Sequence, residues 1–295
     1  MNLPLKDKRI CFVTSDAFPD MTPDDLLAAT TLREAGAKVS PAIWTDTSVR
    51  WQNYNAVIIR SPWDYHLRPD QFRELLNVLE AGKAQVFNSV DVIRWNMNKR
   101  YLLELQSKGI RIPRTCFVNQ AEGFDLNKIR STIGGGEVVV KPEISASAWN
   151  TRRYTLDTLN KRGEEELGQL LATTNLVIQE FMPEVISDGE WSIIFFGDQF
   201  SHAIRKFPAS KDFRVQEEFG GTHRLESDPP DGLLAQAKKA VDACRENLLY
   251  ARVDGIVRDD AFIIMEVELI EPALYFGVDP KSSARFCSRL AQLIS

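Results

Sequence analysis

The sequence predicts an α/β fold whose first part is a small open parallel sheet. Between residues 8 and 88, short apolar segments alternate with segments of helical spacing, as in parallel strands joined by helices. Further along, pairs of strand-like segments separated by short turns indicate antiparallel hairpins. The 295 residues, 44% hydrophobic and 26% charged, form either one large α/β unit or two or three closely connected domains.

The elements of the first part follow from their apolar runs. Gly36 is placed to end the first helix, and Pro41 indicates an edge strand. The predicted elements are strand 8–14, helix 26–35, strand 37–43, strand 54–60, helix 71–81 and strand 84–88.

The loop after the third of these strands is predicted to touch a substrate. Ligands of open parallel sheets lie beyond the carboxyl ends of the strands, where residues 60–66 fall. Within this loop, Arg60, Asp64 and Tyr65 are the candidates that select the substrate, together with the aperiodic loop 208–224, which we expect to be mobile. The alternative is a plain turn with a packing tryptophan, Trp63.

The rest of the chain continues with helices and strands of ordinary length. The triple glycine 134–136 precedes a strand and lacks the pattern of a phosphate loop, so we predict a turn there. The predicted helices are 99–108, 126–133, 164–172, 233–248 and 282–293, and the predicted strands are 114–118, 137–142, 176–181, 191–197, 199–206, 251–257 and 261–269.

The last two strands carry charged residues at positions two apart. Side chains at such positions point to the same face of a pleated strand. A three-residue loop between the strands would place Arg252 opposite Glu266 and gather all of the charged residues on one face. These residues are Arg252, Asp254, Glu266 and Glu268.

Three carboxylates on one face repel one another unless a cation lies between them. Mg²⁺ prefers carboxylate oxygens, so it is the predicted ion, with Mn²⁺ as an alternative, and Asp254, Glu266 and Glu268 are the predicted ligands. Arg252 is placed to hold an anion that the metal also touches. The alternative is the solvated face of an exposed hairpin, but the apolar residues that alternate with the carboxylates favour the metal site.

Two further stretches predict contacts with a nucleotide. Lys141 ends an apolar strand, where a lysine either reaches back to water or meets an anion. The segment 143–153 that follows is small, polar and basic, as in a loop that closes over phosphates, although it uses serine and alanine in place of glycine. The strand 176–181 runs towards Pro183, which stops the sheet and leaves backbone groups placed to read an adenine edge; a plain strand end is the alternative.

Composition argues against several classes of protein. The net charge of −5 and the scattered basic residues argue against nucleic-acid binding. The four cysteines are far apart and form no CxxC pair, which is typical of reduced residues in a cytosolic protein. No apolar run approaches ~18 residues and residues 1–15 lack the apolar core of a signal peptide, so we expect no membrane contact and a cytoplasmic location. A homodimer is compatible with the sequence.

The candidate site residues favour phosphoryl transfer. The three histidines share no zinc-type spacing, and no Ser-His-Asp arrangement is supported. A predicted metal cluster, isolated basic residues and a nucleobase edge suit a reaction in which the protein supplies positioning and charge neutralisation. No general base is evident.

Nearly the whole chain, about residues 8–290, carries an ordered series of short motifs. In order, these are Lys99, VVVKP with Lys141, IQEFMP with Glu180, DGE with Glu190, RVD with Arg252 and Asp254, and MEVE with Glu266 and Glu268. The series resembles the ATP-grasp ligases, in the branch of glutathione synthetase and D-alanine–D-alanine ligase. The stretches RSPWDY, KPEISASA, GEWS, FSHAIRK and ELIEPAL resemble the group that contains the cycloserine-forming O-ureido-D-serine cyclo-ligase.

The resemblance implies a fold and a reaction. The ATP-grasp fold would consist of an N-terminal open parallel α/β domain, residues 1–96, followed by two α+β subdomains, residues 97–184 and 185–295, that sandwich ATP. The carboxylate of a small amino-acid-like substrate would attack the γ-phosphorus and become an acyl phosphate. An amine or similar nucleophile would then displace phosphate, giving an amide or a ring together with ADP.

The resemblance also implies a role for each site residue. Lys99 and Lys141 would bind the ATP phosphates, Glu180, Phe181 and Met182 would line the adenine, Glu190 would take the ribose hydroxyls, Asp254, Glu266 and Glu268 would hold Mg²⁺, and Arg252, Lys206 and Arg214 would neutralise charge at the reacting phosphoryl group. Two features depart from the family. Glu268 stands where the family usually has asparagine, and the phosphate-covering loop lacks the usual glycines.

Two other functions stay open at this point. A regulatory protein could bind ATP on the same fold without turnover, although it need not retain Arg252 and the carboxylates. An unrelated α/β protein would show no ATP-induced thermal shift. The ordered motifs favour the ligase.

Overall fold

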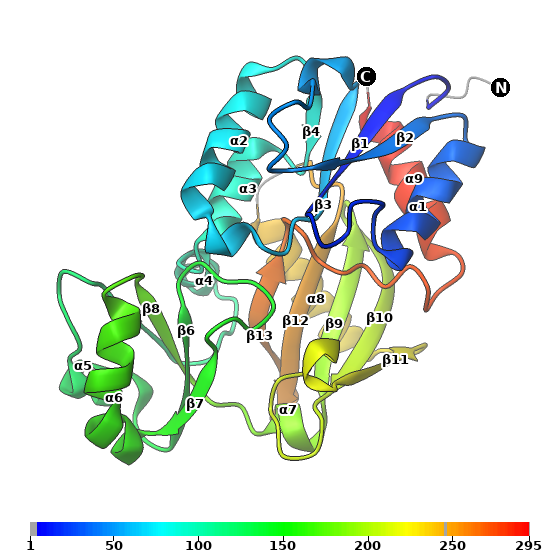
Figure 1. Cartoon of the computed structure of the whole chain (residues 1–295). Helices are drawn as coiled ribbons and strands as arrows, with labels where there is room; N and C mark the ends of the chain where they lie inside the picture. The colour runs from blue at the N-terminus through cyan, green and yellow to red at the C-terminus, as the bar shows by residue number, and fades with distance from the viewer. Residues whose placement is uncertain (1–4, 245–246, 295) are drawn as a thin grey trace.

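The chain folds around three sheets that meet at the centre of the molecule (Figure 1). The computed structural model describes residues 5–244 and 247–294. Within these residues, one sheet is parallel with strand order β2-β1-β3-β4, and two are antiparallel with orders β5-β8-β6-β7 and β11-β10-β9-β12-β13. We refer to them as the parallel sheet, the central sheet (β5 to β8, central in the order of the chain) and the C-terminal sheet.

The strands are β1 (Arg9–Thr14), β2 (Lys38–Ile43), β3 (Ala56–Ser61), β4 (Gln85–Phe87), β5 (Thr115–Val118), β6 (Glu137–Pro142), β7 (Arg152–Thr155), β8 (Leu176–Glu180), β9 (Glu190–Phe196), β10 (Gln199–Phe207), β11 (Thr222–Glu226), β12 (Ala251–Arg258) and β13 (Ala261–Glu268). The α-helices are α1 (Pro23–Glu34), α2 (Pro69–Ala81), α3 (Val90–Met97), α4 (Tyr101–Ser107), α5 (Leu126–Ile133), α6 (Leu156–Leu171), α7 (Glu184–Ser187), α8 (Asp231–Ala243) and α9 (Ser282–Leu293). Short 3₁₀ turns lie at Trp51–Asn53, Tyr65–Leu67 and Glu217–Phe219.

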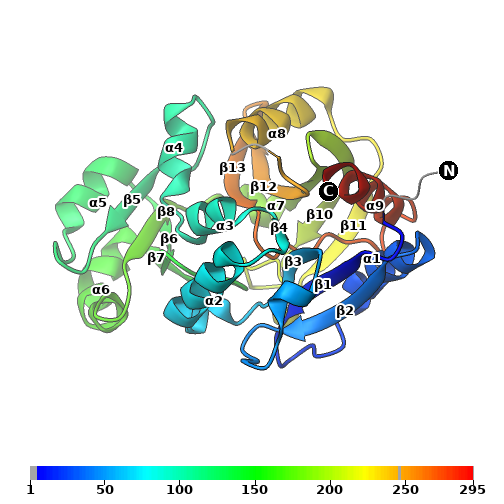
Figure 2. The same ribbon diagram turned by 90° about the horizontal axis from the view of Figure 1, so that it is seen from above.

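The parallel sheet is buried on both faces, as the sequence predicts. Alternate residues of β1 point to opposite faces, so Phe12 packs with α1 and α9, and Val13 packs with α2 and α3. Viewed from above, the helices flank this sheet on its two sides (Figure 2). The predicted edge position of the strand with Pro41 is confirmed, because β2 pairs only with β1 among the described strands.

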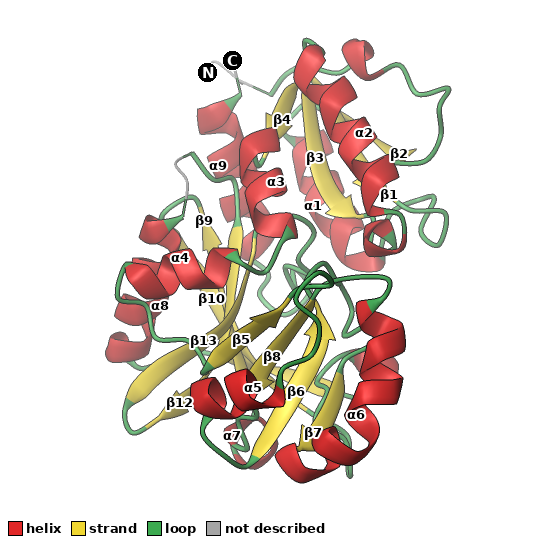
Figure 3. Cartoon of the chain, turned by 90° about the vertical axis from the view of Figure 1, so that its left-hand side faces the viewer, coloured by secondary structure: helices red, strands yellow, loops and turns green. Residues whose placement is uncertain are grey.

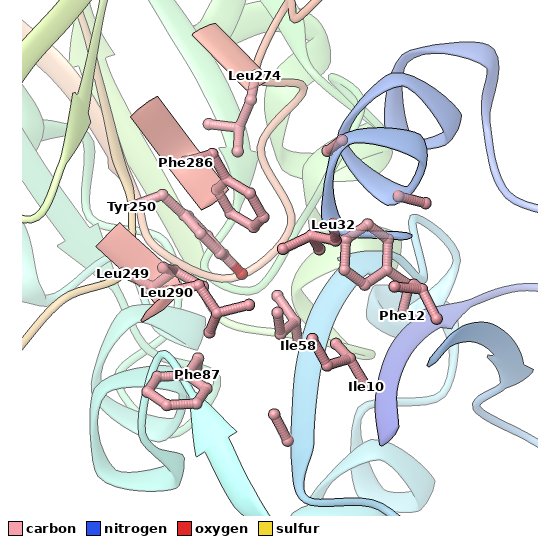
Figure 4. Close-up of a cluster of buried hydrophobic side chains, with 14 of the residues drawn as sticks. Ile10, Phe12, Leu32, Ile58, Phe87, Leu249, Tyr250, Leu274, Phe286 and Leu290 are labelled. Atoms are coloured by element: carbon pink, nitrogen blue, oxygen red, sulfur yellow. The ribbon is translucent and has the colours of Figure 1, made fainter. Parts of the chain in front are cut away.

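One apolar core joins the parallel sheet to the C-terminal sheet. Side chains from β1, β3 and α1 meet side chains from α9 and from the segments that flank β12 and β13 (Figure 4). The residues labelled in Figure 4 are Ile10, Phe12, Leu32, Ile58, Phe87, Leu249, Tyr250, Leu274, Phe286 and Leu290. This shared core fixes the carboxyl ends of the parallel strands above the C-terminal sheet.

The central sheet lies beside the other two and is covered by α5 and α6 (Figure 3). Its apolar side chains pack beneath those helices, among them Val138, Val140 and Ile178. The strand β8 is central in the sheet, and its end at Glu180 leads towards the C-terminal sheet through Met182 and Pro183.

The β12–β13 hairpin has a different register from the predicted one. Its turn is formed by Asp259 and Asp260, both with positive φ (50° and 58°), and a bulge interrupts the pairing after Asp254. As a result Arg252 lies opposite Glu268 and Asp254 lies opposite Glu266, so the expected Arg252–Glu266 pairing is wrong. The predicted common face is confirmed, because the two shifts together move the register by an even number of residues.

Two asparagines fasten the edge of this hairpin to the parallel sheet. The amide of Asn96, on α3, donates to Val267 O (2.8 Å) and accepts from Leu269 N (2.9 Å), which imitates a neighbouring strand. Asn88, after β4, donates to Leu269 O (2.8 Å) and accepts from Leu249 N (2.7 Å). The strand β13, which carries Glu266 and Glu268, is therefore held on its outer edge as well as by β12.

Several predicted boundaries need correction. The sequence analysis missed α3, β7 and β11, so the predicted loops 143–153 and 208–224 each contain a strand. Helices α1 and α6 begin earlier than predicted because Thr22 and Thr155 cap their first turns with side-chain hydrogen bonds. Helix α8 ends at Ala243 and not at Leu248; residues 245–246 of that prediction lie outside the described residues.

Other predictions hold. Helices 126–133 and 282–293 and strand 137–142 have the predicted bounds, and all four cysteines are free. In the described ranges, no helix is long and apolar enough to cross a membrane. The proposed domain limits at residues 96 and 184 stay predictions.

Candidate active site

A cavity of about 830 Å³ opens where the three sheets meet. Its size is that of a pocket for a nucleotide-sized ligand. It collects every predicted site residue except Asp64 from distant parts of the chain. These residues are Arg60, Tyr65, Lys99, Lys141, Glu180, Phe181, Met182, Glu190, Lys206, Arg214, Arg252, Asp254, Glu266 and Glu268.

Arg252 organises the charged end of the cavity, which is formed by β9, β10, β12 and β13 with Lys99 and Lys141. Its guanidinium donates to Asp254 (Nε–Oδ1 3.0 Å, Nη2–Oδ2 2.9 Å), pairs with Glu268 and donates to Ala273 O (3.0 Å). Burial raises the pKa of Asp254, but Arg252 and Lys206 outweigh it and lower that pKa to about 2. Asp254 is therefore ionised.

Lys206 forms the second basic contact of this end. It lies opposite Glu190 in the β9–β10 pairing, forms an ion pair with that carboxylate and lies 3.5 Å from Asp254 Oδ2. The hydroxyl of Ser192 also donates to Asp254. The structure thus places Glu190 against Lys206 and Asp254, while its predicted contact with the ribose stays a prediction.

Lys99 and Lys141 are close together, but only one of them is paired. Lys99 is buried, forms an ion pair with Glu266 (2.8 Å) and donates to Ser145 O (3.0 Å). Within the part of the chain that the structure describes, the ammonium of Lys141 has no hydrogen bond or ion pair. Burial lowers the pKa of Lys141 and the nearby Lys99 adds to this shift, whereas the charge of Glu266 opposes it, so this end of the cavity holds a cation that forms no ion pair within the described residues.

The three predicted metal ligands share the cavity but are not assembled around one point. Among the described residues, no group of three His, Cys, Asp or Glu side chains has a geometry that could hold a metal ion. Each carboxylate instead contacts a basic side chain, Lys99 or Arg252.

The donor set nevertheless fits a hard cation. Burial, together with the charges of Asp254 and Glu266, outweighs Arg252 and raises the pKa of Glu268 to about 8. This crowding of carboxylates is what a divalent ion would relieve, and carboxylate oxygens are the ligands that Mg²⁺ prefers. The fit therefore requires these side chains to exchange their basic partners for the ion.

The opposite, apolar end of the cavity lies between the central and C-terminal sheets. Its lining includes Phe181, Met182, Val185, Val215 and Met265. Phe181 lies between the guanidinium of Arg153 (3.8 Å from the ring centre) and the edge-on ring of Phe213 (5.9 Å).

Glu180 closes the apolar end. Its carboxylate contacts Arg114 (2.8 Å) and Arg258 (3.0 Å), and Arg258 also binds Glu184. The side chain is thus engaged in linking the central sheet to β12. A flat apolar slot with polar groups at its rim suits a nucleobase.

The end of β3 and the loop after it contribute two of the three residues predicted here. Arg60 is 2% exposed, pairs with Asp25 (2.8 Å) and donates to Pro272 O (3.0 Å). Tyr65 is buried and lines the cavity.

Asp64 is not in the lining of the cavity. Its carboxylate accepts from Trp44 Nε1 (2.8 Å) and pairs with Arg68 (2.6 Å), so it fastens the loop to the outer side of the parallel sheet. The carboxylate of Asp64 thus turns away from the cavity, while its predicted contact with the substrate stays a prediction.

Two loops cover the opening of the cavity. The segment after β6 has three non-glycine residues with left-handed backbone, Ser147, Ala148 and Asn150 (φ 49–52°), a conformation that phosphate loops usually achieve with glycine. Its Trp149 packs against the ring of His66 (5.3 Å between ring centres). The second loop holds Arg214, which is paired with Asp212 (2.8 Å).

The cavity also contains residues that the sequence analysis missed, among them Asp25 and Glu271. Asp25 pairs with Arg60, but nothing in the sequence links these two positions. Glu271 also lines the cavity. Its signal was a third acidic residue in the run MEVELIEP, directly before Pro272.

Known proteins are similar to this chain in sequence and in fold. Residues 10–88 match the family described as the N-terminal domain of D-cycloserine synthetase DcsG. The cycloserine biosynthesis protein DcsG of Streptomyces lavendulae is 28% identical over 282 residues, which cover 88% of this chain and 90% of DcsG. The crystal structure of D-cycloserine synthetase DcsG superimposes with a TM-score of 0.86 at 24% identity, covering 97% of this chain and 100% of that one.

Two further solved structures share the fold. D-alanine–D-alanine ligase from Bacillus anthracis has a TM-score of 0.69 at 15% identity, with 97% of both chains covered. The ATP-grasp ligase PsnB, solved with a precursor variant, Mg and ADP, has a TM-score of 0.63 at 17% identity, covering 98% of this chain and 100% of that one. Together, these likenesses support an ATP-grasp ligase near the cycloserine-synthetase group.

This identification confirms the predicted fold class and the ATP-dependent formation of carbon–nitrogen bonds. The regulatory alternative is not favoured. The assignment of individual residues to ligand atoms is a separate question.

Proposed function

We propose that this ATP-grasp ligase activates the carboxylate of a small amino-acid-like substrate as an acyl phosphate and then transfers the acyl group to nitrogen. The observation that carries the proposal is the distribution of charge in one cavity. At one end lie Lys141, which has no ion pair among the described residues, and the two cations Arg252 and Lys206, which both contact Asp254; the apolar slot around Phe181 lies at the other end. A nucleoside triphosphate has the complementary shape and charge.

The residues of this chain divide the work as follows. Lys99 and Lys141 bind the phosphates of ATP, and the slot of Phe181 and Met182 holds the adenine, with Glu180 at its rim. Arg252 and Lys206 hold the carboxylate and the transferred phosphoryl group in contact, which lowers the barrier by charge neutralisation. Arg214 reaches the same group from the covering loop.

Asp254, Glu266 and Glu268 would hold Mg²⁺, with Mn²⁺ as an alternative ion. The ion would neutralise the phosphate oxygens during transfer. Lys99, released from Glu266 in that state, would then be free to turn to a phosphate. Arg60 and Tyr65 line the remaining part of the cavity and would contact the substrate.

A coupled assay tests the proposal. Purified protein with ATP, Mg²⁺ and either O-ureido-D-serine or D-alanine, followed by a panel of other amino acids of both configurations, should release ADP and phosphate in equal amounts with at least one substrate. Lys141→Met should remove this activity, whereas Lys238→Met, at an exposed ion pair, should retain it. ATP binding without release of ADP for any substrate would contradict the proposal and return the regulatory alternative. The cytoplasmic location and a homodimer stay predictions.

A further inference from the structure

Glu271 occupies a fixed position between the end of β13 and the parallel sheet. It follows β13 in a segment that crosses beneath the parallel sheet (Figure 1). Four successive carbonyls of this segment accept hydrogen bonds from buried or half-buried side chains. The contacts are Tyr250 Oη to Ile270 O (2.7 Å), Trp63 Nε1 to Glu271 O (2.9 Å), Arg60 Nη2 to Pro272 O (3.0 Å) and Arg252 Nη1 to Ala273 O (3.0 Å).

Glu271 lines the cavity and, among the described residues, has no cation in an ion pair with it. The other acidic residues that β9, β12 and β13 contribute to the cavity are all paired with Lys or Arg, namely Glu190, Asp254, Glu266 and Glu268. In the described residues, Glu271 forms no ion pair, and its side chain has no side-chain hydrogen-bond partner. It is therefore the acidic group of this region that is free to accept a proton.

The surroundings of Glu271 make it a stronger base than an ordinary glutamate. Burial raises the pKa of Glu271 to about 7, with Lys99 opposing this shift and Glu266 reinforcing it. The titratable and charged groups that face it are Lys99, Glu266, Glu268 and Arg252 from the charged end, and Tyr65 and Tyr250 from the side of the parallel sheet.

We propose that Glu271 is the general base of the ligation step, an inference that rests on the proposed function. The nitrogen nucleophile attacks the acyl carbon and forms the carbon–nitrogen bond. Its excess proton passes to a carboxylate oxygen of Glu271. The carbon–oxygen bond to phosphate breaks, the phosphate leaves with the electron pair, and Glu271 returns its proton to solvent when the product leaves. The carbonyl of Glu271 is fixed by Trp63, and the next two carbonyls of the segment are fixed by Arg60 and Arg252. In the proposed function these two arginines contact the substrate and the transferred phosphoryl group, so Glu271 lies near both.

Glu271→Gln keeps the size of the side chain and removes its basicity. In the assay with O-ureido-D-serine and D-alanine, we expect its kcat to fall by about 10²- to 10³-fold, the usual contribution of a general base. The KM for ATP should change by less than about 3-fold, because the residue does not contact the nucleotide. The acid limb of the wild-type pH profile of kcat should disappear in the variant.

Hydroxylamine separates this role from a structural one. It is unprotonated near neutral pH, so it can trap an acyl phosphate as a hydroxamate without a base. Glu271→Gln should retain wild-type hydroxamate formation while ligation is lost. An equal loss of both products, or unchanged ligation, would overturn the proposal.

Two further variants serve as controls. Glu271→Asp retains a carboxylate and should give an intermediate kcat with the acid limb still present; a flat profile in this variant would count against a base at this position. Asp70→Asn makes the same carboxylate-to-amide change at an exposed helix position and should behave as wild type. If wild-type protein releases no ADP with any substrate, the proposed function fails, and this outcome is distinct from failure of the Glu271 variants.

Discussion

The two ends of the cavity are built in different ways. At the charged end, Lys99, Lys206 and Arg252 each hold carboxylates that neighbouring strands or loops supply, and the backbone of β12 and β13 fixes the geometry. At the apolar end, the lining comes from the short segment after β8, from β13 and from a covering loop, and it depends on packing.

The two ends should therefore differ in how much stability a substitution removes and in how that loss depends on salt. Charged side chains in a buried position need partners, so the loss of one partner is costly and long-range. Apolar side chains lose stability in proportion to the space they leave, so their loss is local and insensitive to salt. The following changes test this difference, from the largest expected effect to the smallest.

Arg252→Met should have the largest effect. The substitution leaves the buried carboxylate of Asp254 and that of Glu268 without their guanidinium, and breaking such a pair typically costs about 3–5 kcal/mol. Chemical denaturation should show this loss in the free energy of unfolding, and ADP release should be abolished. Arg73→Met, which removes an exposed pair with Asp70, should change stability by less than about 0.5 kcal/mol. Equal stability of the two variants would contradict the account of the charged end.

Acidic pH should lower the free energy of unfolding by favouring a proton on His202, a buried residue of β10. Arg285 Nε donates to Ser201 Oγ (2.8 Å), which leaves the Ser201 hydroxyl to donate to His202 Nδ1 (2.8 Å), and His202 Nε2–H donates to Leu274 O (2.9 Å). This arrangement holds the neutral ring. Burial lowers the pKa of His202 to about 4.

The sign of the effect follows from proton binding. Between about pH 6.5 and 4 the unfolded chain binds a proton at this position and the folded chain does not, so stability falls as pH falls, by roughly 3 kcal/mol in total. Denaturation curves of wild type and His202→Gln across this range should differ by that slope. Parallel curves for wild type and His202→Gln would remove this role of His202.

Met182→Ala tests the apolar end. The side chain is 3% exposed and packs with Val185, Val215 and Ile256, so its truncation should cost about 2–3 kcal/mol of unfolding free energy. The weaker ATP binding that follows should not depend on ionic strength. Ile186→Ala, at an exposed neighbouring position, should leave both quantities unchanged. A marked salt dependence in Met182→Ala would show that the two ends are not separable in this way.

Lys141→Met should act on binding and not on stability. Its side chain is half-buried and, in the described residues, forms no ion pair or hydrogen bond, so methionine removes a partly desolvated charge and the protein should be at least as stable as wild type. The Kd for ATP, measured by calorimetry, should rise by about 10- to 30-fold, or roughly 1.4–2 kcal/mol, and the difference should shrink at high salt. A large loss of stability would mean that Lys141 has a structural role.

Asp64→Asn should have the smallest effect. Asparagine can still accept from Trp44, and the lost pair with Arg68 is partly exposed, so stability should fall by less than about 1 kcal/mol. The KM of the substrate should stay within about 2-fold of wild type. A rise of 10-fold or more in KM would restore the substrate contact that the sequence suggested for Asp64.

Local patterns in the sequence determined much of this protein. Alternation along β12 and β13 predicted that Arg252, Asp254, Glu266 and Glu268 share a face, and this prediction survives a wrong register because side-chain direction depends only on whether the shift is even or odd. The alternation of strands and helices likewise predicted the parallel sheet. The ordered motifs then pointed to the ATP-grasp ligases without any contact being known.

Tertiary structure alone decided which charges meet. Lys99 binds Glu266, Arg60 binds Asp25, and Asp64 turns outwards to Trp44, although each of these partners lies far away in the chain or across the sheet. No periodicity encodes such pairs, because they depend on how three sheets pack through the core around Tyr250 and Phe286. In the part of the chain that the structure describes, the same packing leaves Lys141 and Glu271 without an ion pair. The sequence thus determined which residues face the site, and the fold decided which of them are free to act.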